Sequence, residues 1–322
     1  TPDAVVSIDC QAISYYHFIK GIPAKVPLVL DLASPNRLAR LTDSVRFFSS
    51  GHPFCAYLSS RFRRFPALDT SGGNVTHAAL SLAEALGAES ALLLGADFSY
   101  PDGKSYARGT YIYDYFDQRS GRFSPSESLF SGFIFRNTSV FREEDRDAGG
   151  KAYARFVTKP LVAYREHLER FAAASNLDVR PLRGRGVEIR IPPKTGRGPR
   201  RRELFAAGPA TTSAAGFLED YAKELAALPA PREPASVYLS SLPAEARDLW
   251  TTLLPSASAL QRAAGHAGRQ AGAGSAGPAG APAPVSSSTV SARGVIEGPA
   301  ELLEETRAWA LREIAEALEA AR

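Results

Sequence analysis

Short apolar runs alternate with segments of helical spacing along the first 116 residues. Continuous apolar or β-branched runs predict strands at 4–9, 26–32, 45–49 and 91–95. Helical spacing predicts helices at 11–19, 35–41 and 74–86. Residues 54–64 are interpreted as a connector. This repeated strand–helix order predicts an α/β fold, with a Rossmann-like, mostly parallel sheet and flanking helices.

The predicted helix at 74–86 has the most regular pattern. Its apolar stripe consists of Val75, Ala78, Ala79, Leu82, Ala83 and Leu86. Thr70 or Ser71 is expected to cap its start, and Gly87 suits a left-handed end. The wholly apolar run at 91–95 is typical of a strand with both faces covered.

A glycine-rich turn leads into this helix. Gly72 and Gly73 allow a tight entry, and the uncapped amides near Asn74 and Thr76 form a candidate anion site. A stable strand–helix unit without any ligand shows the same pattern, so the turn alone leaves both readings open.

The rest of the chain divides by composition. We expect an α/β domain at 1–180, a basic loop at 181–202, a helical region at 203–266, a low-complexity linker at 267–292 and an amphipathic helix at 293–322. Inside the first domain, the alternating tyrosines of 111–115 suggest a strand. Residues 117–150 are interpreted as a loop-rich excursion, and 151–174 as one long helix kinked at Pro160.

Composition excludes several classes of protein. The 322 residues are 44% hydrophobic and 22% charged, which permits a packed core, and no apolar run reaches the ~18 residues of a membrane helix. No secretory signal is visible. Cys10 and Cys55 are too few for a disulfide framework, so we expect reduced thiols and a cytoplasmic protein. Because the chain opens at Thr1 with a strand-like run and contains no methionine, an N-terminal segment is expected to be missing.

Positive charge is concentrated at 180–202, where eight arginines and one lysine accompany a single acid, Glu188. The segment is interpreted either as an anion-binding patch or as a solvated, glycine-containing loop. It lacks interleaved aromatic residues, and no nucleic-acid partner is expected.

Three predicted strands end in an acid. Asp9, Asp31 and Asp97 follow the runs at 4–9, 26–32 and 91–95. Equivalent ends of parallel strands share one edge of a sheet, so these carboxylates could bind ribose hydroxyls, orient a nucleophile or hold Mg²⁺. Alternatively, each acid caps the turn or helix that follows it.

The loop after the last of these strands carries Asp97, Tyr100 and Tyr106 at fixed spacing. Tyrosine hydroxyls are neutral donors, and when aimed at a leaving phosphate they stabilise developing charge without a metal. We therefore treat these three residues as candidate catalytic residues.

Two segments resemble a known family. PDAVVSID at 2–9 and SGGNVTHAALSLAEALGAESALLLGADFSYPDGKSYARG at 71–109 resemble the bacterial motility accessory factor group, which shares a domain with archaeal 6-hydroxymethylpterin diphosphokinase (MptE-like). The stretch 70–107 is also similar to bacterial sialyltransferases that use CMP-sialic acid. The resemblance covers roughly residues 1–180.

The resemblance implies roles for individual residues. Tyr100 and Tyr106 would contact the phosphate, although the flagellin-modifying group often has His at the Tyr106 position. The residues expected to bind the nucleotide are Asp9, Gly72, Gly73, Asn74, Thr76, Gly95 and Asp97.

The chain also departs from the family's pattern. The family's Gly-x-Gly-Pro-Ser phosphate loop would precede Thr1. No histidine lies between Tyr106 and Tyr164, where the sialyltransferases place a general base. The histidines present at 17, 52, 77 and 167 have no role that the sequence assigns.

Three functions remain open. The leading hypothesis is transfer of a sialic-acid-like sugar from a CMP donor to a protein hydroxyl, with a flagellin-like acceptor and no required cofactor. The second is pyrophosphoryl transfer from ATP, which needs Mg²⁺ at Asp9, Asp31 and Asp97. The third is a non-catalytic scaffold with a nucleotide-sugar fold.

Overall fold

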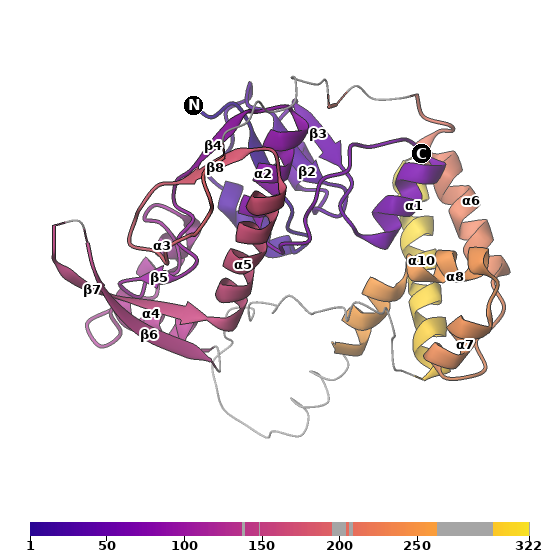
Figure 1. Cartoon of the computed structure of the whole chain (residues 1–322). Helices are drawn as coiled ribbons and strands as arrows, with labels where there is room; N and C mark the ends of the chain where they lie inside the picture. Colours follow the sequence, from indigo (N-terminus) through magenta and orange to yellow (C-terminus); the bar gives the residue numbers. More distant parts are fainter. Residues whose placement is uncertain (137–138, 148, 195–203, 206–208, 263–298, 322) are drawn as a thin grey trace. The chain divides into compact units, whose positions relative to one another are not determined.

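The computed structural model describes residues 1–136, 139–147, 149–194, 204–205, 209–262 and 299–321. The chain forms two compact units (Figure 1). The α/β unit consists of Thr1–Gly51 and Pro66–Ala206, and the helical unit consists of His52–Phe65 and Ala207–Arg322. The low-complexity linker predicted at 267–292 lies outside the described residues.

The α/β unit begins with a parallel sheet in the order β1-β2-β3, formed by Val5–Ser7, Leu28–Asp31 and Val45–Phe48. The central strand β2 is buried along its whole length. Two 3₁₀ helices, η1 (Ala12–Phe18) and η2 (Leu38–Arg40), connect the strands. The predicted strand–helix order of residues 1–49 is confirmed.

A second parallel sheet pairs β4 (Ser90–Leu93) with β8 (Asp178–Pro181). Helices α2 (Val75–Ala85) and α5 (Lys159–Ala174) lie side by side against it (Figure 1). Leu80 of α2 packs in the core of this sheet, whereas Leu82 packs with Val29 and Phe48 of the first sheet. One helix therefore contributes to the cores of both parallel sheets.

The mixed α/β class is confirmed, but the single Rossmann-like sheet is not seen. The described residues form two small parallel sheets and one antiparallel sheet. The prediction that both faces of the strand at 91–95 are covered is wrong. Leu93 is buried, but Leu92 and Leu94 are 66% and 85% exposed, because alternate side chains point to opposite faces of a strand.

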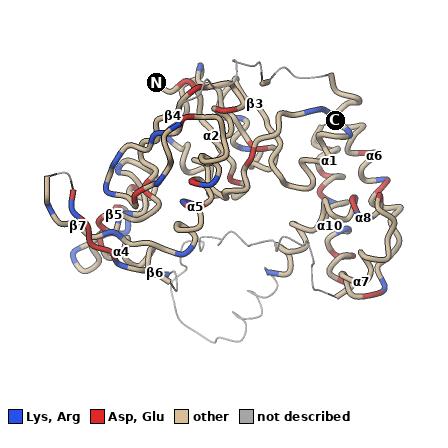
Figure 2. Tube along the Cα trace, viewed as in Figure 1, with Lys and Arg blue, Asp and Glu red and all other residues tan. Residues whose placement is uncertain are grey.

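The antiparallel sheet has the order β5-β7-β6, formed by Tyr100–Pro101, Ala152–Thr158 and Val140–Arg146. Figure 2 shows basic and acidic positions interspersed on it. The single long helix predicted at 151–174 is wrong, because residues 152–158 form β7 and α5 begins at Lys159. Pro160 lies in the first turn of α5, where its missing N–H leaves no intrahelical bond unmade.

The predicted excursion at 117–150 also contains regular structure, since α4 spans Ser126–Ile134 and is followed by β6. The strand predicted at 111–115 is a helix, α3 (Tyr111–Asp117). Its buried residues, Ile112 and Phe116, are four apart and pack with Phe130 of α4. Spacing by four, not the alternate tyrosines, determines which face is buried.

The helical unit contains α1 (Pro53–Arg61), α6 (Ala214–Ala227), α7 (Ala235–Ser241), α8 (Ala244–Thr251) and α10 (Ala300–Ala320). Its core surrounds Trp250 and includes Leu225 and Leu303. The predicted helical character of the described residues after 213 is confirmed. The connector prediction for 54–64 is wrong, because α1 packs its Phe54 and Tyr57 rings on α6. Among the described helices, none has the length and apolar character needed to cross a membrane.

Candidate functional site

The chain turns sharply after β1, and Asp9 stabilises that turn. Its carboxylate Oδ1 accepts a hydrogen bond from the backbone N–H of Gln11 at 2.9 Å, just before η1 begins. The helix η1 then presents Tyr16 and His17, both exposed, to the segment 106–111. Asp9 thus acts as the turn cap that the sequence offered as one alternative.

Four rings form what we call the aromatic cluster: Tyr16, His17, Tyr106 and Tyr111. The His17 ring centroid lies 5.5 Å from that of Tyr106 and 4.9 Å from that of Tyr111, the latter edge to face. Tyr16 lies 5.8 Å from Tyr111, and Tyr106 lies 6.3 Å from Tyr111. These spacings are within the range of favourable aromatic pairs.

Backbone contacts hold the two halves of the aromatic cluster together. Lys20 at the end of η1 donates from Nζ to the carbonyl oxygen of Gly109 at 3.1 Å, and the same nitrogen lies 3.3 Å from an Asp114 carboxylate oxygen. The Tyr113 hydroxyl donates to the carbonyl oxygen of Tyr106 at 3.3 Å. The two contacts of Lys20 connect the segment after β1 to Gly109 and to α3, whereas the Tyr113 contact lies within the second segment.

The electrostatics of the aromatic cluster keep Tyr106 and Tyr111 protonated. Burial and the nearby Asp9 carboxylate raise the pKa of Tyr106. Burial, together with Tyr106 and Asp9, raises the pKa of Tyr111 to about 12. Both hydroxyls are therefore neutral hydrogen-bond donors at neutral pH.

His17 is the titratable base of the cluster. Although His17 as a residue is exposed, partial burial of its imidazole lowers the pKa, and the Asp9 carboxylate partly opposes that shift. A neutral imidazole has a free ring nitrogen that can accept a proton. The sequence gave no reason to choose His17 over the other histidines, because its ring partners come from a segment some 90 residues away.

Tyr100 and Tyr164 connect the aromatic cluster to the glycine-rich turn before α2. Burial raises the pKa of Tyr100, and so do the neighbouring Tyr106 and Tyr164. Tyr164 lies against Gly73, where an added Cβ would approach its ring to 2.9 Å. Gly73 also has a φ of +68°, so the turn needs glycine for its conformation as well as for space. The sequence showed no signal for Tyr164.

The cap of α2 differs from the prediction. Asn74, not Thr70 or Ser71, is the N-cap residue, since its extended backbone fits that position and its Oδ1 accepts from the His77 N–H at 3.0 Å. The Asn74 amide also donates to the carbonyl oxygen of Gly72 at 3.0 Å. Thr76 is half-buried in the first turn of α2.

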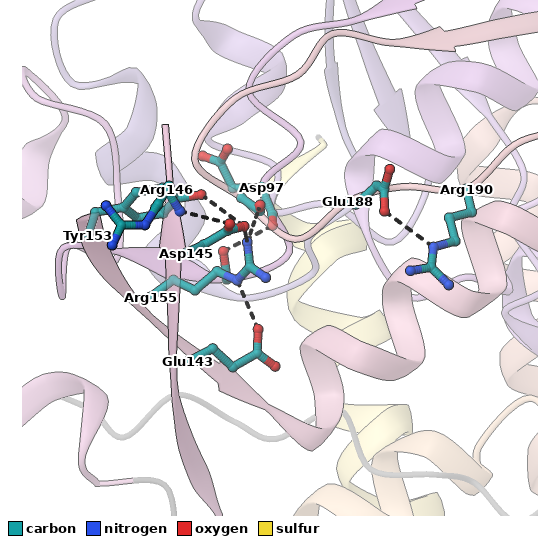
Figure 3. Close-up of polar contacts among 10 residues, drawn as sticks. Asp97, Glu143, Asp145, Arg146, Tyr153, Arg155, Glu188 and Arg190 are labelled. Atoms are coloured by element: carbon teal, nitrogen blue, oxygen red, sulfur yellow. Dashed lines mark hydrogen bonds and ion pairs between the residues drawn. The ribbon is translucent and has the colours of Figure 1, made fainter. Parts of the chain in front are cut away.

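Asp97 packs against residues 184–187. The N–H of Val187 donates to its carbonyl oxygen at 2.8 Å, and an added Cβ on Gly186 would lie 2.4 Å from its Cα (Figure 3). Burial raises the pKa of the Asp97 carboxyl, although a hydrogen bond from the Gly186 backbone opposes the shift. Gly95, two residues earlier, has a φ of +75°.

Arg155 of β7 anchors the segment over Asp97. Its guanidinium donates to the Gly186 carbonyl oxygen at 2.9 Å, to Asp145 at 2.8 Å and to Glu143 at 2.9 Å (Figure 3). Three acceptors thus hold the Arg155 side chain in place. Through its bond to Gly186, Arg155 holds residues 184–187 against Asp97.

Three of the four described arginines in the basic segment are paired with acids. Arg180 pairs with Asp178, Arg190 pairs with Glu188, and Arg185 pairs with Asp102 and Asp147. The arginines beyond residue 194 lie outside the described residues until Arg232. The anion-binding interpretation of this segment therefore gains no support from these three paired arginines.

The three strand-end acids do not form a group. Asp31 is 4% exposed and its Oδ1 accepts from the Ala33 N–H at 3.0 Å. Burial raises the pKa of the Cys10 thiol, and Asp9 and Asp31 raise it further. Asp97 is instead engaged by residues 184–187. Within the described ranges, no three His, Cys, Asp or Glu side chains are grouped as a metal site would need.

Comparison with known proteins supports the resemblance over the first part of the chain. Residues 1–103 match the family model described as 6-hydroxymethylpterin diphosphokinase MptE-like. An uncharacterized protein of Treponema pallidum (strain Nichols) is 37% identical over 142 residues, covering 43% of this chain and 49% of its own length. A second uncharacterized protein of that strain is 26% identical over 141 residues, covering 40% and 36%.

The chain thus spans about half the length, or less, of these curated relatives. No solved structure matches it. The predicted resemblance to the MptE-like family is confirmed over residues 1–103.

Proposed function

Starting from the MptE-like match of residues 1–103, we propose that the α/β unit is a nucleotide-dependent transferase. The single observation that carries the proposal is that Tyr100 interacts electrostatically with both Tyr106 and Tyr164, and that the Tyr164 ring lies against Gly73. It relates the aromatic cluster to the glycine-rich turn, and both regions contain residues expected to meet the nucleotide. Neutral donors beside a helix start suit a ligand that carries a phosphate.

The sheet arrangement gives a second argument. We propose that β1-β2-β3 and β4-β8 are parts of one Rossmann-like arrangement, since α2 packs in the cores of both. Asp9 and Asp97 then follow the carboxyl ends of two of its strands. Ligands of open α/β sheets bind outside these ends.

The preferred chemistry is transfer of a sialic-acid-like sugar from a CMP donor to a protein hydroxyl. The acceptor oxygen forms a bond with the anomeric carbon, and the bond from that carbon to the phosphate oxygen breaks. The electron pair leaves with CMP, whose phosphate is stabilised by the Tyr100 and Tyr106 hydroxyls. The proton of the acceptor hydroxyl passes to a ring nitrogen of neutral His17.

His17 supplies a base that the sequence alone did not locate. It is exposed, and its ring lies against Tyr106, the residue proposed to contact the phosphate. Asp9 stabilises the imidazolium that forms when the proton arrives, because the carboxylate favours the charged ring. Asp97, with Gly72, Gly73, Asn74, Thr76 and Gly95, belongs to the nucleotide side of this proposal.

Pyrophosphoryl transfer from ATP is the second candidate, favoured by the diphosphokinase in the name of the matched family. That reaction uses Mg²⁺ held by carboxylate oxygens. The described residues do not bring Asp9, Asp31 and Asp97 into one group. These three carboxylates therefore do not fit a shared Mg²⁺ site.

A flagellin-like acceptor and a cytoplasmic location complete the proposal. Support for the location comes from Cys10 and Cys55, which are both free thiols. The flagellin-like acceptor follows only from the resemblance to the motility accessory factor group.

Isothermal titration of the full 322-residue chain with CMP, and separately with ATP and Mg²⁺, tests the proposal. We expect CMP to bind and Tyr100→Phe to weaken binding. Tyr115→Phe is the matched control, since Tyr115 packs with Phe116 of its own helix and with Arg119 just beyond the end of that helix. Binding of ATP with Mg²⁺ but not CMP would favour the diphosphokinase candidate. Binding of neither nucleotide would leave the scaffold hypothesis as the better account.

A further inference from the structure

His77 is a deeply buried polar side chain that the proposed reaction does not use. It lies in the first turns of α2, is 2% exposed, and packs its ring 4.5 Å from the ring of Phe171 in α5. Its Nε2 lies 3.1 Å from Oδ2 of Asp69. A buried imidazole beside a half-exposed carboxylate needs an explanation, because burial of a polar ring is costly unless its nitrogens are used.

Asp69 connects His77 to the residues before the helix. Its Oδ1 accepts from the Ser71 N–H at 2.8 Å, and its own N–H donates to Ser81 Oγ at 2.9 Å. Although burial acts to raise it, hydrogen bonds from Ser71 and His77 hold the pKa of the Asp69 carboxyl below its ordinary value. Asp69 is therefore an acceptor at neutral pH, and Nε2 of His77 must carry the proton between them.

The other ring nitrogen of His77 points at the glycine-rich turn. Nδ1 is buried and has no hydrogen-bond partner among the described residues. A Cβ added to Gly72 would lie 2.2 Å from Nδ1, so only glycine fits beside the ring at this position. An unprotonated Nδ1 tolerates this contact, whereas a second ring proton would create a buried donor without an acceptor.

The backbone of His77 is part of the same arrangement. Its N–H donates to Oδ1 of Asn74, and the Asn74 amide donates to the carbonyl oxygen of Gly72. On the other side of the turn, Nδ1 of His167 lies 3.4 Å from the carbonyl oxygen of Ser71. His77 thus contacts the turn residues from Asp69 to Asn74 through both its ring and its backbone.

We infer that His77 is the positioning residue of the nucleotide site, holding the turn 69–74 so that the remaining first-turn amides of α2 face a phosphate. The inference rests on the proposed function and names a further residue of that same site. The ring acts through Asp69 and Gly72 and does not touch the ligand. The titratable group that faces the ring is Asp69, whereas His167 contacts the turn only at the carbonyl oxygen of Ser71.

Two substitutions of His77 in the full chain separate positioning from core filling. In H77Q the side-chain amide keeps a donor close to the place of Nε2, whereas H77L fills the space without one. We expect H77L to weaken CMP binding by about tenfold, as the loss of one well-placed hydrogen bond implies. We expect H77Q to bind within about threefold of the unchanged chain. Equal losses in H77L and H77Q, or no loss in either, would overturn the inference.

Asp69→Ala keeps the His77 ring in place and serves if H77L does not fold. It should weaken CMP binding by about fivefold to tenfold, and unchanged binding would contradict the inference.

A ligand-free measurement keeps this inference separable from the proposed function. Nitrogen-15 spectra of the imidazoles at pH 7 should show His77 with a protonated Nε2 and a bare Nδ1. The backbone amide shifts of residues 71–74 should move in H77L and return in H77Q. A doubly protonated His77, or unmoved amides in H77L, would overturn the inference. Failure of the unchanged chain to bind CMP would instead count against the proposed function.

Discussion

The imidazole of His17 stands edge-on to the ring of Tyr111, with centroids 4.9 Å apart and an interplanar angle of 89°. The two residues come from different elements, η1 and α3, and each is influenced by the carboxylate of Asp9. This contact places the uncharged imidazole of His17, which can accept a proton, beside the protonated hydroxyls of Tyr106 and Tyr111. The end of β1 therefore has a proton acceptor and hydroxyl donors nearby, in addition to the turn that Asp9 caps.

Replacing His17 tests its role in proton transfer. His17→Gln should lower kcat for sugar transfer by about 10²-fold to 10⁴-fold, the usual contribution of a general base. CMP affinity should change little, because the phosphate contacts are assigned to Tyr100 and Tyr106. Steady-state kinetics with a CMP-sugar donor, alongside CMP titration, measures both quantities. His52→Asn is the control, since His52 caps α1 and asparagine also caps helices.

The pH profile gives an independent check on the same residue. Burial holds the His17 pKa below its ordinary value of about 6.5, so the base is free at neutral pH and becomes protonated only in more acidic solution. The rate should therefore fall as the pH drops through that lowered pKa. Asp9→Asn should move this acid limb to still lower pH, because it removes the carboxylate that favours the imidazolium. If the rate of His17→Gln still falls over the same acidic pH range, protonation of another group causes the fall.

The phosphate contact of Tyr106 can be separated from its packing. Tyr106→Phe keeps the ring beside His17 and removes only the hydroxyl. We expect kcat to fall by about 10²-fold, as for loss of one donor that stabilises a developing anion. Tyr115→Phe should leave the rate unchanged. Equal rates for both variants would remove Tyr106 from the proposed mechanism.

Gly73→Ala probes the close approach between the glycine-rich turn and Tyr164. The substitution strains a residue with a φ of +68° and brings a Cβ to 2.9 Å from the Tyr164 ring. We expect a loss of about 1–3 kcal/mol in the free energy of unfolding, measured by urea denaturation. Gly132→Ala in α4 is the control, because open space surrounds that position and alanine is the better helix former. A destabilisation no larger than that of the control would contradict the described approach.

The sequence predicted the elements whose spacing was unambiguous. The stripe from Val75 to Leu86 and the apolar runs at β1, β2 and β3 are regular enough for local pattern to decide. Tyr111–Asp117 was misread because its tyrosines alternate, while Ile112 and Phe116 determine the buried face. In the helix predicted at 151–174, the first residues form the strand β7. Because the burial pattern of β7 does not alternate cleanly, the sequence pattern does not separate this strand from α5.

The candidate site was predicted only in part, for a physical reason. Asp9, Tyr100 and Tyr106 stood out because each follows a recognisable strand or motif. His17 and Tyr164 did not, since their importance comes from neighbours that are distant in the sequence. The contact of Asp97 with Gly186 is equally non-local and depends on Arg155 of β7. Only the fold brings such pairs together.

Carbon-13 aromatic spectra of the full chain during titration with CMP test the central claim most directly. The account predicts that CMP selectively shifts the ring signals of His17, Tyr100 and Tyr106, and leaves those of Tyr57 and Tyr238 in the helical unit unmoved. Saturable binding that shifts none of the first three rings, or no binding of CMP at all, would contradict it.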